Sequence, residues 1–188
     1  MAALLPEGTA RLLDLGCGTG LELEPIFARF PALKVTGVDL TAAMLDRLRA
    51  KFPDRDLTLI RGSYVGMDFG RERYDAAVSF ETLHHLEPEE KGALYRRVWE
   101  ALTPEGVYVE CDYIAATAEE EESLRAEHRR LRMETGADED TLYHFDIPCT
   151  LEHQKALLEA AGFIQVTAEP LEGNTVLLTA RKVTPTGA

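Results

Sequence analysis

The chain has 188 residues, of which 45% are hydrophobic and 28% are charged. This length suits one domain with a complete core and is too short for two, so residues 1–188 are expected to form a single domain. A formal net charge of −13 would repel a phosphate backbone, which argues against nucleic acid as a partner. No apolar run approaches the roughly 20 residues that cross a bilayer, and the N-terminus lacks a signal-peptide pattern, so no membrane partner and a cytoplasmic location are expected.

The three cysteines indicate free thiols in a reducing compartment. Cys17, Cys111 and Cys149 lie far apart and lack the paired spacing of zinc sites. Clustered Asp and Asn positions of the kind that hold magnesium are not evident either. The sequence therefore predicts no bound metal.

Strand and helix patterns alternate along the first two thirds of the chain. Strands are predicted over 10–15, 33–40, 57–62, 74–80 and 106–114, and helices over 21–30, 42–52 and 87–102. Such alternation is typical of an α/β, doubly wound, mostly parallel sheet with helices on both faces. A ligand of such a sheet binds at the carboxyl ends of the strands.

The last third follows a different pattern. The polar stretch 117–140 predicts a solvated helix supported by an i,i+4 pair between Glu121 and Arg125, and 114–149 is expected to form a helical lid over the domain.

An amphipathic helix is predicted to end at Gly162. Two strands over 163–170 and 174–182 then follow, joined by a Leu-Glu-Gly turn, and the tail 183–188 is expected to be loose.

The segment LLDLGCGTGLE places three glycines directly after the first strand. Gly16 suits a turn with positive φ, Gly18 permits a ligand to approach the backbone, and Gly20 permits close helix packing. A loop that binds nucleoside triphosphates would need a lysine and a Ser or Thr after the last glycine, where Leu21 and Glu22 stand. The loop therefore suits a nucleoside-type cofactor without a triphosphate.

The dinucleotide fingerprint G-x-G-x-x-G is a closer alternative, but the spacing here is G-x-G-x-G. Glu22 and Glu24 disfavour a pyrophosphate at the helix start. They suit a cofactor with a sulfonium and an α-amino group, and Asp14 adds another carboxylate. Asp39, at the end of the second strand, is predicted to bind ribose hydroxyls. Its alternative role is to cap the next helix, for which Thr41 is also available.

The ordered motifs LLDLGCGTGLE, VTGVDL, YDAAVSFETLHHL, LTPEGVYVECDY and LLEAAGF resemble the class I S-adenosylmethionine-dependent methyltransferases. The resemblance covers nearly all of the chain outside the acidic lid. It implies a Rossmann-like sheet of seven strands with the last antiparallel, S-adenosylmethionine as cofactor, and methyl transfer to a small-molecule acceptor. Ser79-Phe-Glu-Thr82 replaces the Asn-Pro-Pro-Tyr type of motif, which excludes the usual adenine-DNA and glutamine-protein methylases.

The same resemblance implies which residues contact the cofactor. They are Asp14, Gly16, Cys17, Gly18, Gly20, Asp39, Leu40, Met44, Ser63, Tyr64, Phe80 and Glu81. Asp14 and the glycines would line the methionine end, with Phe80 and Glu81 bordering it, while Leu40 and Met44 would pack on adenine. Members often carry Gly-Asp after the third strand, whereas Ser63 occupies the acidic position here, so a weaker adenine contact is expected.

Candidate catalytic residues follow the fourth strand and the lid. His84 or His85 could act as a general base, and a structural cap is the alternative for either. Residues 143–146 either line an acceptor pocket or anchor the lid to the core. His85 and His144 are the catalytic candidates.

Only eleven residues precede Leu12, where members usually carry one or two covering helices. This predicts an open site, a site covered by a partner subunit, or missing residues at the front. Two alternatives to the enzyme follow. One is a non-catalytic S-adenosylmethionine-binding or regulatory subunit that needs a partner, and the other is a nicotinamide oxidoreductase, which the glycine spacing disfavours. A homodimer is left open.

Overall fold

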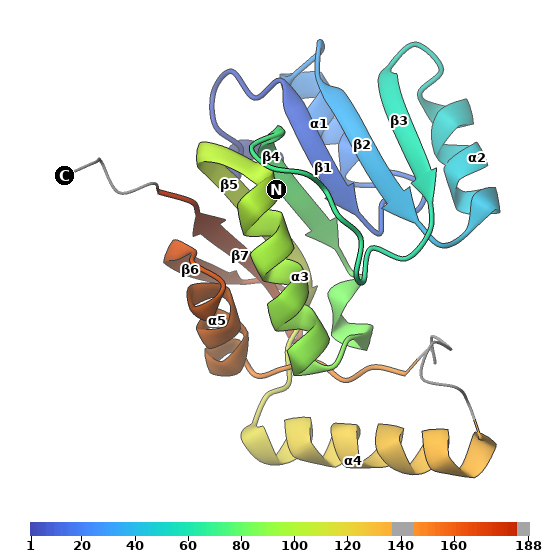
Figure 1. Cartoon of the computed structure of the whole chain (residues 1–188), viewed down its shortest axis with the longest axis vertical. Coiled ribbons are helices and arrows are strands. Elements are labelled where there is room, and N and C mark those ends of the chain that lie inside the picture. The colour runs from blue at the N-terminus through green and yellow to red at the C-terminus, as the bar shows by residue number, and fades with distance from the viewer. Residues whose placement is uncertain (137–144, 184–188) are drawn as a thin grey trace.

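The computed structural model describes residues 1–136 and 145–183 and contains a seven-stranded sheet in the order β3-β2-β1-β4-β5-β7-β6 (Figure 1). The strands are β1 (Arg11–Leu15), β2 (Lys34–Asp39), β3 (Asp56–Arg61), β4 (Tyr74–Phe80), β5 (Leu102–Tyr113), β6 (Ile164–Pro170) and β7 (Thr175–Arg181). The strands from β3 to β5 pair in parallel, and β7 runs antiparallel between β5 and β6. The predicted fold class, with its antiparallel last strand, is confirmed.

Five α-helices and two short 3-10 helices connect the strands in the described residues. They are η1 (Ala2–Leu4), α1 (Leu23–Arg29), α2 (Ala42–Lys51), η2 (Leu83–His85), α3 (Pro88–Ala101), α4 (Ala118–Thr135) and α5 (Leu151–Ala160). None of the described helices has the length and apolar character that a bilayer crossing demands.

The fifth strand begins earlier than the sequence pattern predicts. Leu102 already pairs with Tyr74, and the register then shifts before Val107 pairs with Ala76. Glu105 within this irregular stretch has a φ of 65°. The sequence interpretation placed the strand only after this irregularity because the polar stretch before Val107 does not alternate regularly.

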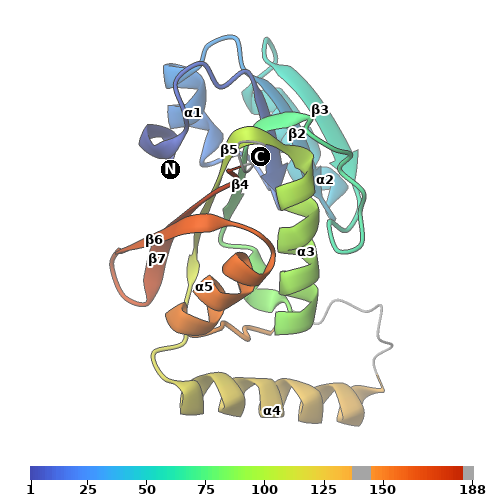
Figure 2. The same cartoon turned by 60° about the vertical axis from the view of Figure 1, so that its left-hand side comes forward.

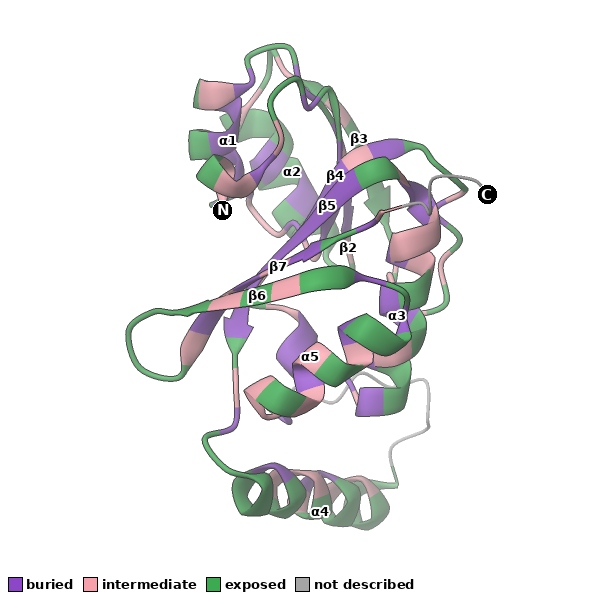
Figure 3. Ribbon diagram, turned by 90° about the vertical axis from the view of Figure 1, so that its left-hand side faces the viewer, coloured by how far each residue is buried: buried purple, intermediate pink, exposed green. Residues whose placement is uncertain are grey.

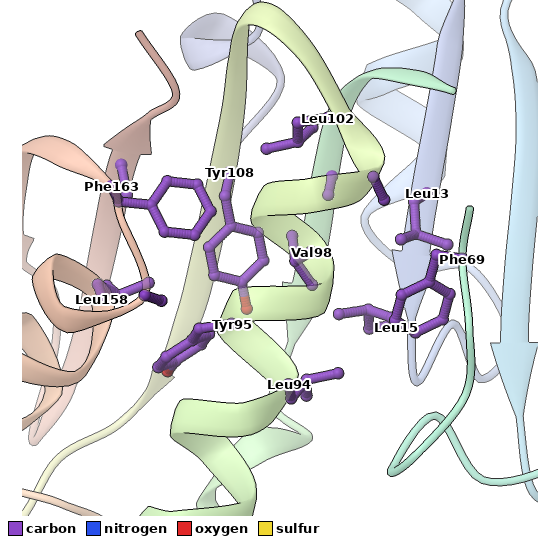
Figure 4. Packing of buried hydrophobic residues seen from close by; sticks show 14 of the residues in the cluster. Leu13, Leu15, Phe69, Leu94, Tyr95, Val98, Leu102, Tyr108, Leu158 and Phe163 are labelled. Carbon is purple, nitrogen blue, oxygen red and sulfur yellow. The ribbon is translucent and has the colours of Figure 1, made fainter. Parts of the chain in front are cut away.

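The sheet is covered on both faces, which is why its central strands are almost continuously apolar. Alternate residues of β1 point to opposite faces, so Leu13 and Leu15 pack in the core under α3 and α5, whereas Leu12 packs in the core under α1 and α2. Figure 3 shows the resulting buried stripe through β4 and β5. In Figure 4, Leu94 and Val98 of α3 point toward this central part of the sheet.

A polar network crosses the core between α3, α5 and β5. Glu110 accepts hydrogen bonds from the hydroxyls of Tyr95 at 2.8 Å and Tyr108 at 2.9 Å, and another from the amide of Gln154. Lys91, which is fully buried, donates to the Gln154 carbonyl at 3.0 Å. The polar side chains of this network therefore partner one another, as a low-dielectric core requires.

Helix α4 is anchored to the rest of the protein by charged groups. Glu121 accepts a hydrogen bond from the Thr150 amide at 2.6 Å and pairs with His153 at 2.5 Å, while Arg125 pairs with Glu87 at 3.0 Å. The predicted Glu121–Arg125 pair is wrong, because each residue instead binds a group outside the helix. The expectation of a fully solvated helix is wrong at Glu121, which is buried, although Figure 3 shows that most of α4 is exposed.

The buried network makes stability depend on pH. Burial raises the pKa of Glu110 to about 7, with Lys91 opposing and Asp112 adding to the rise. The folded protein therefore keeps this proton over a range in which the unfolded chain has lost it, and the associated stability disappears as the pH rises through 7. We expect the free energy of unfolding to fall by roughly 2 kcal/mol more in the wild type than in Glu110→Gln between pH 5 and pH 8.

Urea unfolding at the two pH values measures this difference. Glu159→Gln, at an exposed position on α5, serves as the matched control and should follow the wild type. Parallel pH profiles for wild type and Glu110→Gln would show that Glu110 is ionised throughout this range.

Candidate functional site

A cavity of about 370 Å³ opens at the carboxyl ends of the parallel strands, in the size range of small-molecule sites. It is lined by Gly16, Gly18, Asp39, Leu40, Thr41, Met44, Ser63, Tyr64, Val65, Glu81, Thr82, His85 and Leu86. These residues come from the loops that follow β1, β2, β3 and β4. This is the edge of the sheet where ligands of doubly wound folds bind.

The structure brings most of the predicted site residues together around this cavity. Those that line it are Gly16, Gly18, Asp39, Leu40, Met44, Ser63, Tyr64, Glu81 and His85. Asp14, Cys17, Gly20 and Phe80 do not line it, and His144 lies outside the described residues. The sequence interpretation did not assign four lining residues to the site, although each adjoins a residue that it named or weighed: Thr41, Val65, Thr82 and Leu86.

The glycine loop is held against the ends of β2 and β4. Gly16 has a φ of 68°, its amide donates to the Val38 carbonyl at 2.8 Å, and a Cβ placed on it would lie 2.3 Å from the Thr82 hydroxyl oxygen. Gly18 also has a positive φ, but a Cβ there would have no neighbour closer than 3.9 Å. Gly20 is packed tightly, since its Cβ would lie 3.2 Å from Leu23. The backbone at Gly18 is thus the most approachable part of the loop.

Asp39 connects this loop to the following helix. One carboxylate oxygen accepts from the Gly18 amide at 3.0 Å, and the other accepts from the Thr41 amide at 2.7 Å. Thr41 is the N-cap of α2 but makes no cap hydrogen bond through its side chain, so the expectation that its hydroxyl caps the helix is wrong. Each Asp39 oxygen can still accept a further hydrogen bond, because a carboxylate oxygen has two lone pairs.

Two acids are buried beneath the loop. Asp14 is completely buried, and no backbone amide, hydroxyl or basic group of the described residues donates to its carboxyl oxygens or to one oxygen of Glu22; the two carboxyls interact with each other instead. Burial, followed by the neighbouring Glu22, raises the pKa of Asp14 well above its usual range, and burial also raises the pKa of Glu22. Glu22, which the sequence interpretation treated as a negative charge at the helix start, is thus a buried acid that favours its neutral form more than a free glutamate does.

Unpartnered buried carboxyls are costly, and a cationic hydrogen-bond donor bound against them would remove that cost. The pair consequently suits a ligand that carries an ammonium group. Lys51 reaches the same loop, but its ammonium donates to the Gly20 carbonyl at 3.2 Å and pairs with Glu24 at 3.4 Å. Because Lys51 already binds the Gly20 carbonyl and Glu24, the site keeps a net negative charge.

The chain turns sharply at the end of β4. Glu81 has a φ of 48°, in the left-handed region that costs a non-glycine residue about 1 kcal/mol or more, and its amide donates to the Cys111 carbonyl at 2.8 Å. The Tyr64 hydroxyl donates to the Thr82 carbonyl at 3.0 Å, and burial raises the pKa of Tyr64 to about 12. Tyr64 is therefore a neutral hydrogen-bonding group that fixes the turn.

A histidine–aspartate pair lies directly behind the cavity. Nδ1 of His84 lies 2.5 Å from one oxygen of Asp112, whose other oxygen accepts from the amides of Leu83 at 2.7 Å and His84 at 3.1 Å. Burial alone would raise the pKa of Asp112, but its hydrogen bond and charge interaction with His84 lower it. The sequence interpretation missed Asp112, whose signal is a carboxylate near the carboxyl end of a mostly buried strand.

The chain returns to this region after α4. Asp146 lies 3.2 Å from Nδ1 of His85 and 3.6 Å from Nε2 of His84. The ring of Phe145 stacks on His128 of α4, and its carbonyl lies 3.3 Å from His85. Phe145 therefore contacts α4, and Phe145 and Asp146 both contact His85, but neither residue lines the cavity, so the acceptor-pocket role weighed for residues 143–146 stays a prediction.

Comparison with known proteins defines the class. Residues 12–106 match the methyltransferase domain family, which is half of the chain. The chain belongs to the class I S-adenosylmethionine-dependent methyltransferases.

Two individual relatives match parts of the chain at about one third sequence identity. The carboxy-S-adenosyl-L-methionine synthase of Chromohalobacter salexigens is 30% identical over 172 residues, covering 84% of this chain and 63% of that protein. The trans-aconitate 2-methyltransferase of Deinococcus radiodurans is 34% identical over 114 residues, covering 57% of this chain and 40% of that protein. The chain thus spans less than two thirds of the length of these curated relatives.

Solved structures share the fold. A S-adenosylmethionine-dependent methyltransferase from Mesorhizobium loti aligns with a TM-score of 0.70 and 22% identity over 96% of this chain and 94% of its own. Human N-acetylserotonin methyltransferase in complex with S-adenosylmethionine aligns with a TM-score of 0.65 and 19% identity over 94% of this chain and 48% of its own. At these identities the likeness shows the fold alone.

The tight contact at Gly16 leads to a stability prediction. Gly16→Ala should lower the free energy of unfolding by about 2 to 4 kcal/mol, because it adds a methyl group against Thr82 as well as the cost of a positive φ. Gly18→Ala carries the backbone cost without the close contact and should lose only about 1 kcal/mol. Urea unfolding of both variants measures the difference, and equal losses would contradict a restrictive contact at Thr82.

Proposed function

We propose that this chain transfers the methyl group of S-adenosylmethionine to a small-molecule acceptor and releases S-adenosylhomocysteine. The observation that carries the proposal is the arrangement at one edge of the sheet, where Asp39 holds an open glycine loop next to Asp14 and Glu22, two buried acids whose closest charged neighbours include each other. A loop of this kind suits an adenosyl cofactor that is cationic and lacks phosphate.

The nucleoside half of the cofactor would occupy the side of the cavity next to α2. Asp39 retains acceptor capacity for the ribose hydroxyls. Leu40 and Met44 are 44% and 38% exposed, which is unusual for two neighbouring large apolar side chains on a cavity wall. An adenine ring packed on them would remove that exposed surface from water.

The methionine half would lie toward the glycine loop. Its α-amino group would interact with the acids beneath the loop, where Asp14 and one oxygen of Glu22 receive no hydrogen bond from an amide, hydroxyl or basic group of the described residues. A bound ammonium would stabilise their ionised forms and lower their pKa values from the raised ones of the ligand-free protein.

The reaction needs little from the protein beyond alignment. The cofactor supplies an activated methyl group on a sulfonium leaving group, so binding and orientation provide most of the rate enhancement. Glu81 and His85, which line the cavity beside the turn after β4, would face the acceptor. His85 is the described member of the predicted catalytic pair.

The acceptor class follows only from general properties of the chain. A net charge of −13 favours a small molecule over nucleic acid. The free thiols of Cys17, Cys111 and Cys149 suit a reducing compartment, so a cytoplasmic location is part of the proposal. The relatives include both a carboxy-S-adenosyl-L-methionine synthase and a trans-aconitate 2-methyltransferase, so the proposal names the acceptor only as a small molecule.

A metabolite screen tests the function directly. The purified chain is incubated with S-adenosylmethionine and pools of small acceptors, and mass spectrometry follows S-adenosylhomocysteine, methylated products and altered forms of the cofactor. Acceptor-dependent release of S-adenosylhomocysteine supports methyl transfer. Formation of a modified S-adenosylmethionine, or binding without turnover, would overturn it in favour of a synthase or a non-catalytic binding subunit.

Thermal unfolding in the presence of different cofactors tests which class of cofactor the protein binds. S-adenosylmethionine and S-adenosylhomocysteine at about 100 times their dissociation constants should stabilise the protein by roughly 2.7 kcal/mol, whereas NAD should not shift the thermal midpoint. Stabilisation by NAD alone would point to an oxidoreductase.

Asp39→Ala should weaken binding of S-adenosylhomocysteine at least tenfold, or about 1.4 kcal/mol. The substitution removes the predicted acceptor of the ribose hydroxyls and releases the Gly18 amide. Isothermal titration calorimetry measures the affinity, with Asp46→Ala at an exposed position of α2 as the matched control. Wild-type affinity in a folded Asp39→Ala protein would mean that the cofactor lies elsewhere.

A further inference from the structure

Three side chains of the types that bind transition metals converge where η2 borders the cavity. Nδ1 of His85 lies 3.2 Å from a carboxylate oxygen of Asp146, and Nε2 of His84 lies 3.6 Å from the same oxygen. One ligand atom from each residue lies within 4.8 Å of the others. A tetrahedral zinc ion keeps its ligand atoms about 3.3 Å apart, so the three groups need only small shifts to share one ion.

His84 is oriented as metal-binding histidines commonly are. Its Nδ1 lies 2.5 Å from Asp112, and Asp112 is itself fixed by the backbone amides of Leu83 and His84. The ring of Tyr113 lies 4.9 Å from the ring of His84. A carboxylate on one ring nitrogen leaves the other with its lone pair available, and this pairing raises the basicity of a histidine ligand.

The remaining two groups have contacts that an ion can replace. Nδ1 of His85 lies within reach of Asp146 and of the Phe145 carbonyl, and a metal ion would take the place of the proton shared there. The Asp146 side chain is 63% exposed, so an ion can enter from solvent. Because His85 also lines the cavity, the fourth position of a tetrahedral ion would adjoin the cavity.

We propose that His84, His85 and Asp146 bind a divalent transition-metal ion of the zinc type at the acceptor end of the cavity. Two imidazoles and one carboxylate favour zinc, cobalt or iron over magnesium and calcium, which prefer oxygen ligands. Three protein ligands and one open position are typical of catalytic rather than structural zinc sites.

The site itself does not depend on methyl transfer. If the proposed function also holds, the ion would bind a hydroxyl or carboxylate oxygen of the acceptor, and a bound hydroxyl would lose its proton more readily. The acceptor class would then be a small molecule that is methylated next to, or on, a metal-bound oxygen, with His84 and His85 acting as ligands.

A second group of potential ligands carries no such proposal. In the cluster of Glu121, Cys149 and His153, one Glu121 oxygen accepts from the Thr150 amide and the other pairs with His153. Burial raises the pKa of the Cys149 thiol, which disfavours the thiolate that a metal requires. This cluster is already satisfied internally and supplies a control.

Titration of the metal-free chain with Zn²⁺ in a calorimeter, and with Co²⁺ in a spectrometer, tests the site without cofactor or acceptor. We expect one ion per chain and the intense visible absorption of four-coordinate Co²⁺. Asp146→Asn, at an exposed position, should keep the fold and lose at least tenfold in affinity, and His85→Ala should do the same. Asp112→Asn should lose about tenfold to a hundredfold through His84.

His153→Gln is the matched control and should bind as the wild type does. Absence of Zn²⁺ binding, or binding that survives Asp146→Asn and His85→Ala but is lost in His153→Gln, would overturn the proposal. Calorimetry of S-adenosylhomocysteine is measured separately, so failure of the metal site and failure of the proposed function are distinguishable.

Discussion

The arrangement of the site depends on the carboxylate of Asp39. It lies at the carboxyl end of β2, beside the switch point of the sheet, and accepts one backbone amide from the loop after β1 and another from the start of α2. These amides would otherwise be unpaired donors at the rim of a cavity, where each lost hydrogen bond costs about 1 kcal/mol or more. The single side chain therefore fixes two walls of the cavity relative to each other and leaves Gly18 open between them.

The acids beneath the loop differ from Asp39, because they lack the backbone hydrogen bonds that Asp39 has. Asp14 and Glu22 are buried without sufficient donors, so the ligand-free protein holds them with raised pKa values. A core can tolerate such a pair only if the rest of the fold compensates, and parallel strands buried on both faces provide that compensation. Under the proposed function, a cationic ligand would recover this cost, and the stability of the fold would then depend on occupation of the site.

The fold could be predicted from the sequence because its signals are local. Strand and helix patterns alternate, and the glycine spacing after the first strand marks the loop, so the order of elements and most cavity residues follow. The failures have a common physical cause. The burial of Glu22, the role of Thr41, the partner of Glu121 and the pairing of His84 with Asp112 are all decided by groups distant in sequence, for which local pattern carries no information. The convergence of Asp146 with His84 and His85 belongs to the same category.

The position of α4 connects these long-range contacts. Figures 1 and 2 both place it beyond the carboxyl ends of the parallel strands, beside the start of α3. Its buried residues are Glu121 and His128, and His128 pairs with Glu87 at 3.2 Å while stacking on Phe145. α4 is therefore held to the rest of the protein by partly buried ion pairs, and removal of one partner would leave a charge without compensation. Because Phe145 is directly followed by Asp146, a shift of α4 would also move a ligand of the proposed metal site.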